Sequence, residues 1–289
     1  EGMSAIAGEP EHFADCFEAE GGDRQGFAQR RFFARYLGEL LDGAVGTGHI
    51  DLIHCSAKSA EASNGGWRID FEDGSSIDAE AVVLAIGNQE PAPLPAFKGA
   101  GERYIANPWG DEARATVNDL VINGGDALLI GTGLTMVDLA LSLDAAGHRG
   151  RILALSRRGQ VPRGHADYDP APVEASEAPR GSVRRIWRWL RRRSAEVGWR
   201  AAVDSLRPHS HALWQSLDVE EQRRFLRHAR AWWDVHRHRI APEVAATIAR
   251  LIAEDRLQVI AGRVVAASPA RDGIEVEFQQ VPVVGIRVG

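Results

Sequence analysis

Apolar residues at helical spacing mark the first clear element of the chain. Residues 28–43 carry large apolar side chains three and four positions apart, and Gly43 suits the end of a helix. The stripe consists of Phe32, Phe33, Tyr36, Leu37, Leu40 and Leu41. This spacing predicts an amphipathic helix that buries one face.

Strand-like patterns follow this helix. Ile50–Cys55 is a short apolar run, and Trp67–Phe71 alternates apolar with polar residues before the turn-forming pair Asp73 and Gly74. Ala81–Ile86 is apolar throughout, which predicts a strand buried on both faces. The pattern therefore predicts a helix and short strands in the first part of the chain.

A strand–turn–helix–strand order begins after a proline-containing stretch. Residues 88–100 hold three prolines and are predicted to be an extended linker. Ala127–Ile130 is a short apolar strand that runs directly into Gly131, Thr132 and Gly133. A helical pattern covers Leu134–Ala146, and Arg151–Leu155 is the next strand. Together these segments predict a βαβ unit over residues 127–159.

The rest of the chain is predicted to be mainly helical. Residues 160–181 form a loop, and a helical region over 182–255 is broken at Pro208, Asp218 and Pro242. Three short strands complete the pattern, at Leu257–Ile260, Val264–Ala267 and Ile274–Phe278.

The glycines of the βαβ unit predict a nucleotide site. Gly131 permits a tight turn, and Gly133 leaves room for a pyrophosphate to approach the backbone. The first helix turn offers unpaired N–H groups and the positive end of its dipole to that anion. The predicted contacts are Gly131, Thr132, Gly133, Leu134 and Thr135, although Met136 stands where the pattern usually has Gly or Ala. The alternative is a glycine turn that serves only the fold.

The end of the second strand selects the nucleotide. Enzymes that use NAD usually have a carboxylate here, whereas this chain has Ser156, Arg157 and Arg158. A guanidinium can hold the 2′-phosphate of NADP(H) with two hydrogen bonds. The sequence therefore favours NADP(H). The alternative is that both arginines are solvated surface groups.

Composition limits the other function classes. The net charge of −6 over 289 residues argues against whole-chain affinity for nucleic acid or an anionic membrane, so neither is an expected partner. Two cysteines, no apolar run of about 20 residues and no signal peptide predict a cytoplasmic protein. Neither end has the features of a natural terminus, so a truncated chain is expected. The oligomeric state and the substrate are not predicted.

Other clusters of charged residues have simpler interpretations. Arg184–Arg193 is strongly basic, but its apolar residues lie at helical spacing, which favours a core stripe with arginines in water over a nucleic-acid or membrane surface. The stripe is Val183, Ile186, Trp187 and Leu190. Asp234, His236 and His238 diverge on a helix, so no metal site is predicted. His165 either lines the NADP(H) site or lies at a loop surface.

Several short motifs resemble one family. Gly131–Asp138, Leu155–Gly159 and Val161–His165 resemble segments of bacterial FAD/NAD(P)-binding proteins, which are flavoproteins with two dinucleotide sites related to N-hydroxylating flavin monooxygenases. Further motifs occur in the same order as in that family. They are Gly2–Ala5, Arg30–Leu41, Ala85–Gly87, Asn107–Trp109 and Trp233–Pro242. The resemblance covers nearly the whole chain.

The resemblance implies an α/β fold of three parts. These are a partial FAD-binding-type domain over 1–100, a Rossmann-like, doubly wound NADP-binding domain with an inserted helical segment over 101–255, and return strands over 256–289. FAD joins NADP(H) as an implied cofactor, although no glycine fingerprint for FAD precedes Gly2. Gly87, Asn107, Trp109 and His165 complete the predicted cofactor-binding set.

Three hypotheses for function remain at this point. The first is an NADPH-dependent flavoprotein oxidoreductase of the monooxygenase type, in which no catalytic acid or base is identified because the cofactor carries the chemistry. The second is a non-catalytic NADP(H)-binding module. The third is a partner-binding protein that uses the arginine-rich helix.

Overall fold

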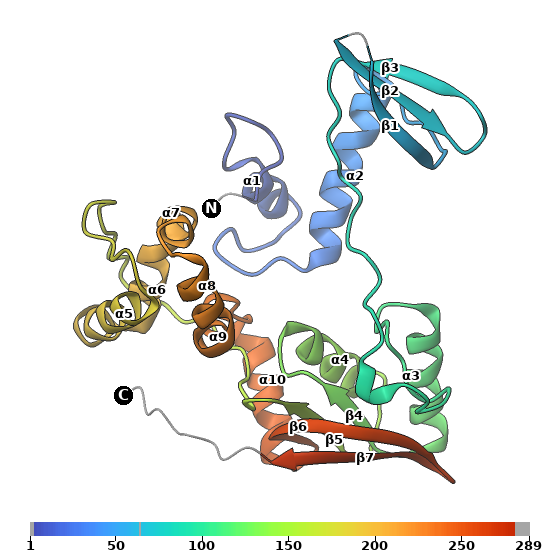
Figure 1. Cartoon of the computed structure of the whole chain (residues 1–289), viewed down its shortest axis with the longest axis vertical. Helices are drawn as coiled ribbons and strands as arrows, with labels where there is room; N and C mark the ends of the chain where they lie inside the picture. The colour runs from blue at the N-terminus through green and yellow to red at the C-terminus, as the bar shows by residue number, and fades with distance from the viewer. Residues whose placement is uncertain (1–2, 64, 281–289) are drawn as a thin grey trace. The chain divides into compact units, whose positions relative to one another are not determined.

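The computed structural model describes residues 3–63 and 65–280 and has a mixed α/β fold. The chain divides into two compact units, Glu1–Gln89 and Glu90–Gly289 (Figure 1). Each unit has its own sheet. The predicted division at residues 100 and 255 stays a prediction.

The first unit contains two helices and a small antiparallel sheet. The helices are α1 (His12–Ala19) and α2 (Arg30–Gly46), and the strands are β1 (Ala57–Ser63), β2 (Gly66–Phe71) and β3 (Ser76–Ala79), in the order β1-β2-β3. The helix predicted over 28–43 and the strand predicted at Trp67–Phe71 are thus confirmed as α2 and β2.

Aromatic rings hold α1 against α2. The Phe13 ring lies 5.2 Å from those of Phe33 and Tyr36, edge to face, and the Tyr36 hydroxyl lies 2.9 Å from His12 Nδ1. Such tilted ring pairs stabilise a contact beyond their buried area. Tyr36 is buried as the stripe predicted, but Leu37 and Leu41 are exposed because α1 covers only one edge of the stripe.

Two predicted strands of the first unit are wrong. Ile50–Cys55 and Ala81–Ile86 have no regular structure, and Val83 is 88% exposed. A strand needs a neighbour for its backbone N–H and C=O groups. In the described part of the first unit, the sheet consists of β1, β2 and β3, and neither apolar run joins it.

The second unit is built on a four-stranded sheet. Its strands are β4 (Ala127–Ile130), β5 (Ile152–Ser156), β6 (Leu257–Ala270) and β7 (Gly273–Gln280), in that order. The pairs β4–β5 and β5–β6 are parallel, and β6–β7 is antiparallel. Leu257–Ile260 and Val264–Ala267, predicted as separate strands, form one strand. β6 pairs with β7 on both sides of a register shift between Val264 and Ala266.

Helices pack against the parallel part of this sheet. They are α3 (Asp111–Asn123), α4 (Leu134–Ala145) and α10 (Pro242–Ala253). Val137 of α4, Leu251 of α10 and Ile152 of β5 are among the most deeply buried residues of the shared core. The predicted strand–helix–strand order over 127–159 is confirmed as β4-α4-β5, with Gly147 at φ +88° just beyond the helix.

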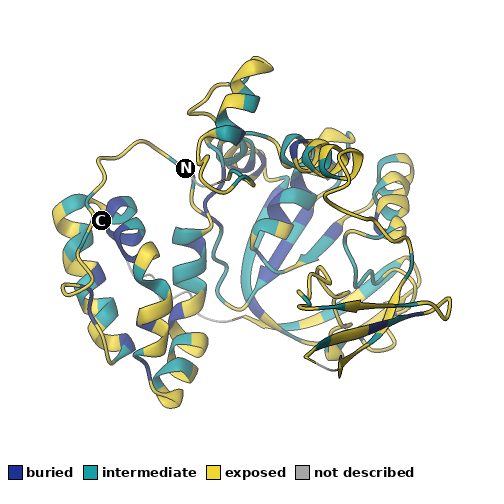
Figure 2. Cartoon of the chain, turned by 90° about the horizontal axis from the view of Figure 1, so that it is seen from above, coloured by how far each residue is buried: buried dark blue, intermediate teal, exposed yellow. Residues whose placement is uncertain are grey.

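The connection from β5 to β6 carries the predicted helical region. Its helices before α10 are α5 (Val183–Val197), α6 (Trp199–Leu206), α7 (Ser210–Gln215), α8 (Val219–Arg224) and α9 (Arg230–Arg237). They are joined by a 3₁₀ turn, η2 (Arg207–His209), and a π-helical turn, η3 (Phe225–Ala229). A further 3₁₀ turn, η1 (Pro95–Phe97), lies earlier in the chain, before α3. Asp218 caps α8 and Pro242 begins α10, as predicted, while Gly198 adds an unpredicted break. Val183 and Leu190 are buried, which confirms the core stripe on α5. Figure 2 shows buried residues where these helices face one another.

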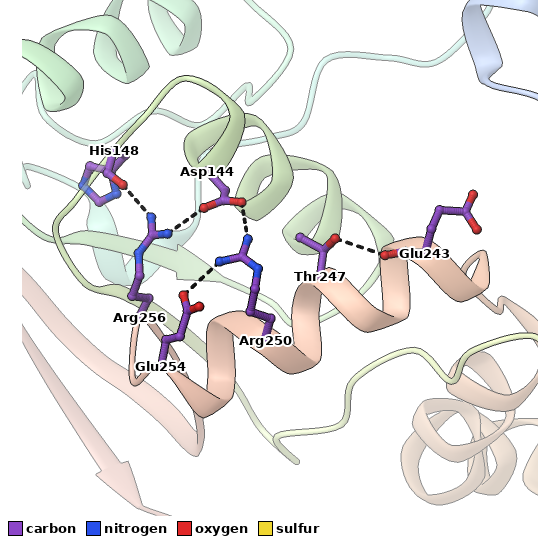
Figure 3. A network of polar contacts seen from close by, with 7 residues as sticks. All are labelled: Asp144, His148, Glu243, Thr247, Arg250, Glu254 and Arg256. Atoms are coloured by element: carbon purple, nitrogen blue, oxygen red, sulfur yellow. Dashed lines mark hydrogen bonds and ion pairs between the residues drawn. The ribbon is translucent and has the colours of Figure 1, made fainter.

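A polar network fixes α4 to α10 and to the start of β6 (Figure 3). Asp144 accepts hydrogen bonds from Arg250 and Arg256, both at 2.6 Å, and Arg250 also pairs with Glu254 at 2.8 Å. Burial opposes ionisation of Asp144, but the two arginines outweigh it and hold its pKa below the ordinary value. Arg256 also donates to the backbone carbonyl of His148. The network anchors the end of α4 opposite to the glycine loop.

Candidate nucleotide-binding site

The loop between β4 and α4 has the backbone geometry of an anion site. Gly131 has φ +113°, a conformation that favours glycine, and its N–H donates to the Leu155 carbonyl at 2.8 Å. Gly133 is the N-cap of α4, and no side chain of the described residues caps this helix start. A Cβ placed on Gly133 would meet nothing within 4 Å. The helix start therefore has uncapped N–H groups and open space beside them.

Thr132 and Ser156 stabilise the loop with their side chains. Thr132 is 5% exposed, and its hydroxyl lies 2.9 Å from Ser156 Oγ and donates to the Gln160 carbonyl. Ser156 Oγ also accepts from the Gly159 N–H at 3.0 Å. These bonds tie the ends of β4 and β5 together. The hydroxyl groups of Thr132 and Ser156 are therefore engaged within the loop. The groups of the loop that remain for a ligand are backbone groups.

The residue at the third position of the glycine pattern packs in the core. Met136 is 3% exposed and lies in the cluster that includes Ile152 and Leu257. Methionine fills irregular gaps between a helix and a sheet, so this position accepts it without changing the loop. Leu134 is half-buried, and Thr135 is exposed on the first turn.

Two arginines follow Ser156 at the carboxyl end of β5. Arg157 is exposed and makes no ion pair or hydrogen bond with any residue that the structure describes. Arg158 donates from Nη2 to the carbonyl of Arg227 in the π-helical turn, at 3.2 Å. Ligands of parallel sheets bind at this carboxyl edge. The two guanidinium groups thus flank the same edge as the glycine loop.

His165 lies in a different cluster, with Asp204 and Arg239. The Arg239 side chain is 1% exposed and forms an ion pair with Asp204, which also accepts from the Tyr168 hydroxyl. Burial lowers the pKa of His165, and the nearby charge of Arg239 lowers it further. The structure therefore places His165 beside this polar cluster, and its contact with NADP(H) stays a prediction.

Sequence reasoning missed most of this cluster. Arg200 donates to the Gly164 carbonyl at 2.8 Å, and its guanidinium lies 4.3 Å from the centre of the Trp199 ring. His236 packs edge-on against Trp199 and donates from Nδ1 to the Trp232 carbonyl at 2.7 Å, and burial lowers its pKa. The segment Trp233–Pro242 was the available signal, because it contains both His236 and Arg239.

The remaining predicted site residues lie outside the glycine loop. Gly87 has φ +67° and belongs to the exposed end of the first unit. Asn107 accepts a hydrogen bond from the Trp109 N–H at 3.1 Å and lines a cavity of about 590 Å³, while Trp109 is 55% exposed. Gly131 is not among the residues that line this cavity. Within the second unit, the glycine loop, the cavity lined by Asn107 and the polar cluster around His165 are formed by different residues.

The first unit is similar to a known protein family. Residues 1–89 match the model of the FAD-NAD(P)-binding family. This confirms the predicted resemblance to FAD/NAD(P)-binding proteins, and it supports a flavin or nicotinamide nucleotide as ligand and a role of the oxidoreductase kind. The match coincides with the first unit, so the Gly131 loop lies outside it. No curated protein matches the chain.

Two kinds of feature are absent from the described residues. None of the helices in this part of the chain combines the length and apolar character needed to cross a bilayer. Within residues 3–63 and 65–280, no group of three or more His, Cys, Asp or Glu side chains is arranged to hold a metal ion.

Proposed function

We propose that the chain acts in an NADPH-dependent flavoprotein oxidoreductase of the monooxygenase type, with NADP(H) held by the second unit. The observation that carries the proposal is the β4–Gly131-Thr132-Gly133–α4 geometry, with an uncapped helix start at the carboxyl edge of parallel strands. The family match over residues 1–89 supports the flavin part.

The pyrophosphate fits the start of α4. The first turn of a helix has N–H groups without internal partners, and the helix dipole places about half a positive charge there. Since Gly133 has no side chain and no neighbour within 4 Å of a Cβ position, a phosphate group can reach these N–H groups. Leu134 and Thr135 belong to this first turn and contribute backbone donors.

Arg157 and Arg158 give the preference for a 2′-phosphate. Arg157 has no competing partner among the described residues, whereas Arg158 exchanges its hydrogen bond to the Arg227 carbonyl for one to the phosphate. A guanidinium–phosphate contact is charge-assisted and stronger than a bond to a carbonyl. NADPH is therefore preferred over NADH.

The residues of this chain bind and orient the cofactor. When bound, NADPH would supply a hydride, and a flavin would carry the electrons to an acceptor. Gly131 and Gly133 fix the pyrophosphate, and the bonds among Thr132, Ser156 and Gln160 keep the loop rigid. The two free cysteines, Cys16 and Cys55, fit the reducing cytoplasm in which NADPH is abundant.

The variant Gly133→Asp tests the site separately from the fold. Aspartate is a favoured N-cap residue, so the substitution leaves α4 intact or stabilises it by about a few tenths of a kcal/mol. Its carboxylate occupies the phosphate position and repels the pyrophosphate. We expect NADPH affinity, measured by titration calorimetry, to fall at least tenfold while the melting temperature is unchanged or raised. Unchanged affinity in a folded variant would contradict the site.

Arginine variants test the choice of nucleotide. We expect Arg157→Gln with Arg158→Gln to weaken NADPH binding about tenfold or more and to leave NADH binding nearly unchanged. Arg149→Gln is the matched control, because Arg149 is exposed at the opposite end of β5. Equal loss of both nucleotides would overturn the assignment of the 2′-phosphate.

A non-catalytic NADP(H)-binding module is the second candidate function. It is favoured because the order strand, Gly-x-Gly, helix occurs once among the described residues, at Gly131–Gly133. One such unit accounts for one nucleotide, whereas the oxidoreductase uses two. The candidates differ in one experiment, in which FAD and then NADPH are added without oxygen. Bleaching of the flavin absorbance by NADPH but not NADH supports the oxidoreductase. Binding of NADPH with no bleaching supports the module.

A further inference from the structure

A second concave site lies in the helical region of the second unit. It is a cavity of about 520 Å³ between the loop before α5 and the first three turns of that helix. Charged and aromatic side chains dominate its lining. They are Arg180, Arg185, Arg188, Arg192, Trp189 and Glu177. None of these residues belongs to the glycine loop or its arginines.

Helical spacing explains why the α5 side chains converge. Arg185, Arg188 and Arg192 are three and seven positions apart, with Trp189 between them, so all four share one face of the helix. Arg180 comes from the loop, where it donates to the Ala175 carbonyl at 3.3 Å. The folded loop therefore adds a fourth guanidinium that helix periodicity alone does not supply.

Three of these arginines lack the close acidic partners that many other arginines of the described residues have. Arg24, Arg151 and Arg256 each pair with a carboxylate within 3.0 Å. No carboxylate of the described residues lies within 4.0 Å of the guanidinium groups of Arg180, Arg185 or Arg188. Arg192 reaches only Glu196, at 4.0 Å. The cavity thus has four guanidinium groups and one carboxylate, Glu177, in a chain of net charge −6.

The floor of the cavity is apolar and firmly packed. Ala178 and Pro179 are buried, and Trp189 is half-buried against the core around Leu206. The arginines of the lining are therefore exposed, and the lining also contains a half-buried indole ring. This combination accepts a ligand that has several negative charges and tolerates contact with a flat ring.

We propose that this cavity binds a small molecule with two or more phosphate groups. Guanidinium groups recognise phosphate through paired hydrogen bonds, and four of them balance a polyphosphate better than a single carboxylate ligand. The phosphates come either from free polyphosphate or from a nucleotide whose base stacks on Trp189. Both sources share the chemistry that the arginines recognise.

The observations favour a small ligand over a nucleic acid. The guanidinium groups converge on one cavity, whereas a nucleic-acid surface presents them along an extended track. The chain as a whole is acidic, which opposes association with a long polyanion. Nucleic acid and membrane are therefore outcomes that count against the proposal.

Titration calorimetry with the full chain tests the site. The probes are inorganic tripolyphosphate and ATP without magnesium, in a buffer of low salt. We expect Arg185→Gln with Arg188→Gln to weaken both at least tenfold. The matched control, Arg184→Gln with Arg191→Gln, removes the same charge from exposed arginines of α5 that do not line the cavity, and is expected to change affinity less than twofold.

A third variant separates the two sources of phosphate. If ATP binds at least tenfold more tightly than tripolyphosphate and Trp189→Leu removes that difference, the ligand is a nucleotide. If the two probes bind alike and Trp189→Leu has no effect, the ligand is a polyphosphate group alone. Both outcomes support the proposal.

Three results would overturn it. One is equal loss of affinity in both arginine pairs, which indicates general charge attraction. Another is absence of tripolyphosphate and ATP binding by a folded chain. The third is binding of duplex RNA or of phosphatidylserine vesicles that both pairs weaken equally, which indicates a basic helix surface. Unchanged melting temperatures of the variants exclude misfolding as the cause of a loss.

Discussion

The strand β5 and the segment Ala81–Ile86 are both apolar runs, yet they have opposite environments. Ile152 and Ala154 are completely buried, because β5 pairs with β4 on one side and β6 on the other and is covered by helices. Val83 and Leu84 are 88% and 78% exposed, with no strand of the described residues beside them. An apolar sequence therefore specifies a strand only where the fold supplies its neighbours.

The contrast predicts a large cost for truncating β5. Ile152→Ala removes a fully buried side chain from the core shared with Leu251 and Leu257, and is expected to lower the free energy of unfolding by about 2–5 kcal/mol. Urea denaturation of the second unit measures it. A loss below about 1 kcal/mol would show that this core is loosely packed.

The network at the end of α4 is the next largest contribution. Asp144→Asn weakens the bonds to Arg250 and Arg256, and we expect a loss of about 1–3 kcal/mol. Asp111→Asn is the control, because its pair with Arg114 is almost fully exposed and is expected to contribute under about 0.5 kcal/mol. Equal effects of the two variants would contradict the importance assigned to burial.

Acidic pH should weaken the second unit through its histidines. The pKa values of His165 and His236 are lowered in the fold, mainly by burial and also by the charges of Arg239 and Arg163. Asp204 acts in the opposite direction at His165, and the hydrogen bond to the Trp232 carbonyl does so at His236. The unfolded chain therefore binds more protons, and stability falls as pH drops from about 7 to about 5.5. Replacing both histidines with Gln should flatten this dependence, measured by melting at each pH. An unchanged slope would assign it to other groups.

The smallest effect is expected in the exposed run of the first unit. Val83→Ser is expected to change the free energy of unfolding by no more than about 0.5 kcal/mol, because the side chain makes few contacts. Chemical denaturation measures the change, with Ile152→Ala as the large-effect reference. A loss above about 1.5 kcal/mol would show that Ala81–Ile86 is buried in solution, and the contrast with β5 would then disappear.

The sequence predicted the local elements of the second unit better than their assembly. The period of Leu134–Ala146 and the glycines around it defined α4 closely, since these signals are local. The union of two predicted strands into β6 was missed, because Arg263 and its neighbours interrupt the apolar pattern where the partner strand changes from β5 to β7. Pairing partners are a tertiary property.

The candidate site also has features that the sequence predicted and features that it did not. Glycine geometry and the two arginines after β5 follow from residue type and spacing, so they were predictable. The roles of Thr132 and Ser156 were not, because the bond between their hydroxyls joins residues on different strands. The pairing of Asp204 with Arg239 likewise depends on how α6 meets the segment after α9.

Two segments of the long connection between β5 and β6, one before α5 and one after α9, are hydrogen-bonded to each other. The Ile240 N–H donates to the Arg163 carbonyl at 3.0 Å, and the His165 N–H donates to the Ile240 carbonyl at 2.8 Å. The segments that enter and leave the α5–α9 bundle therefore lie side by side, just before α10. For protein engineering, this means that the bundle could be deleted or replaced as one segment. A short turn from Arg163 to Ile240 would bypass it and leave β4-α4-β5, α10 and β6 in one continuous chain.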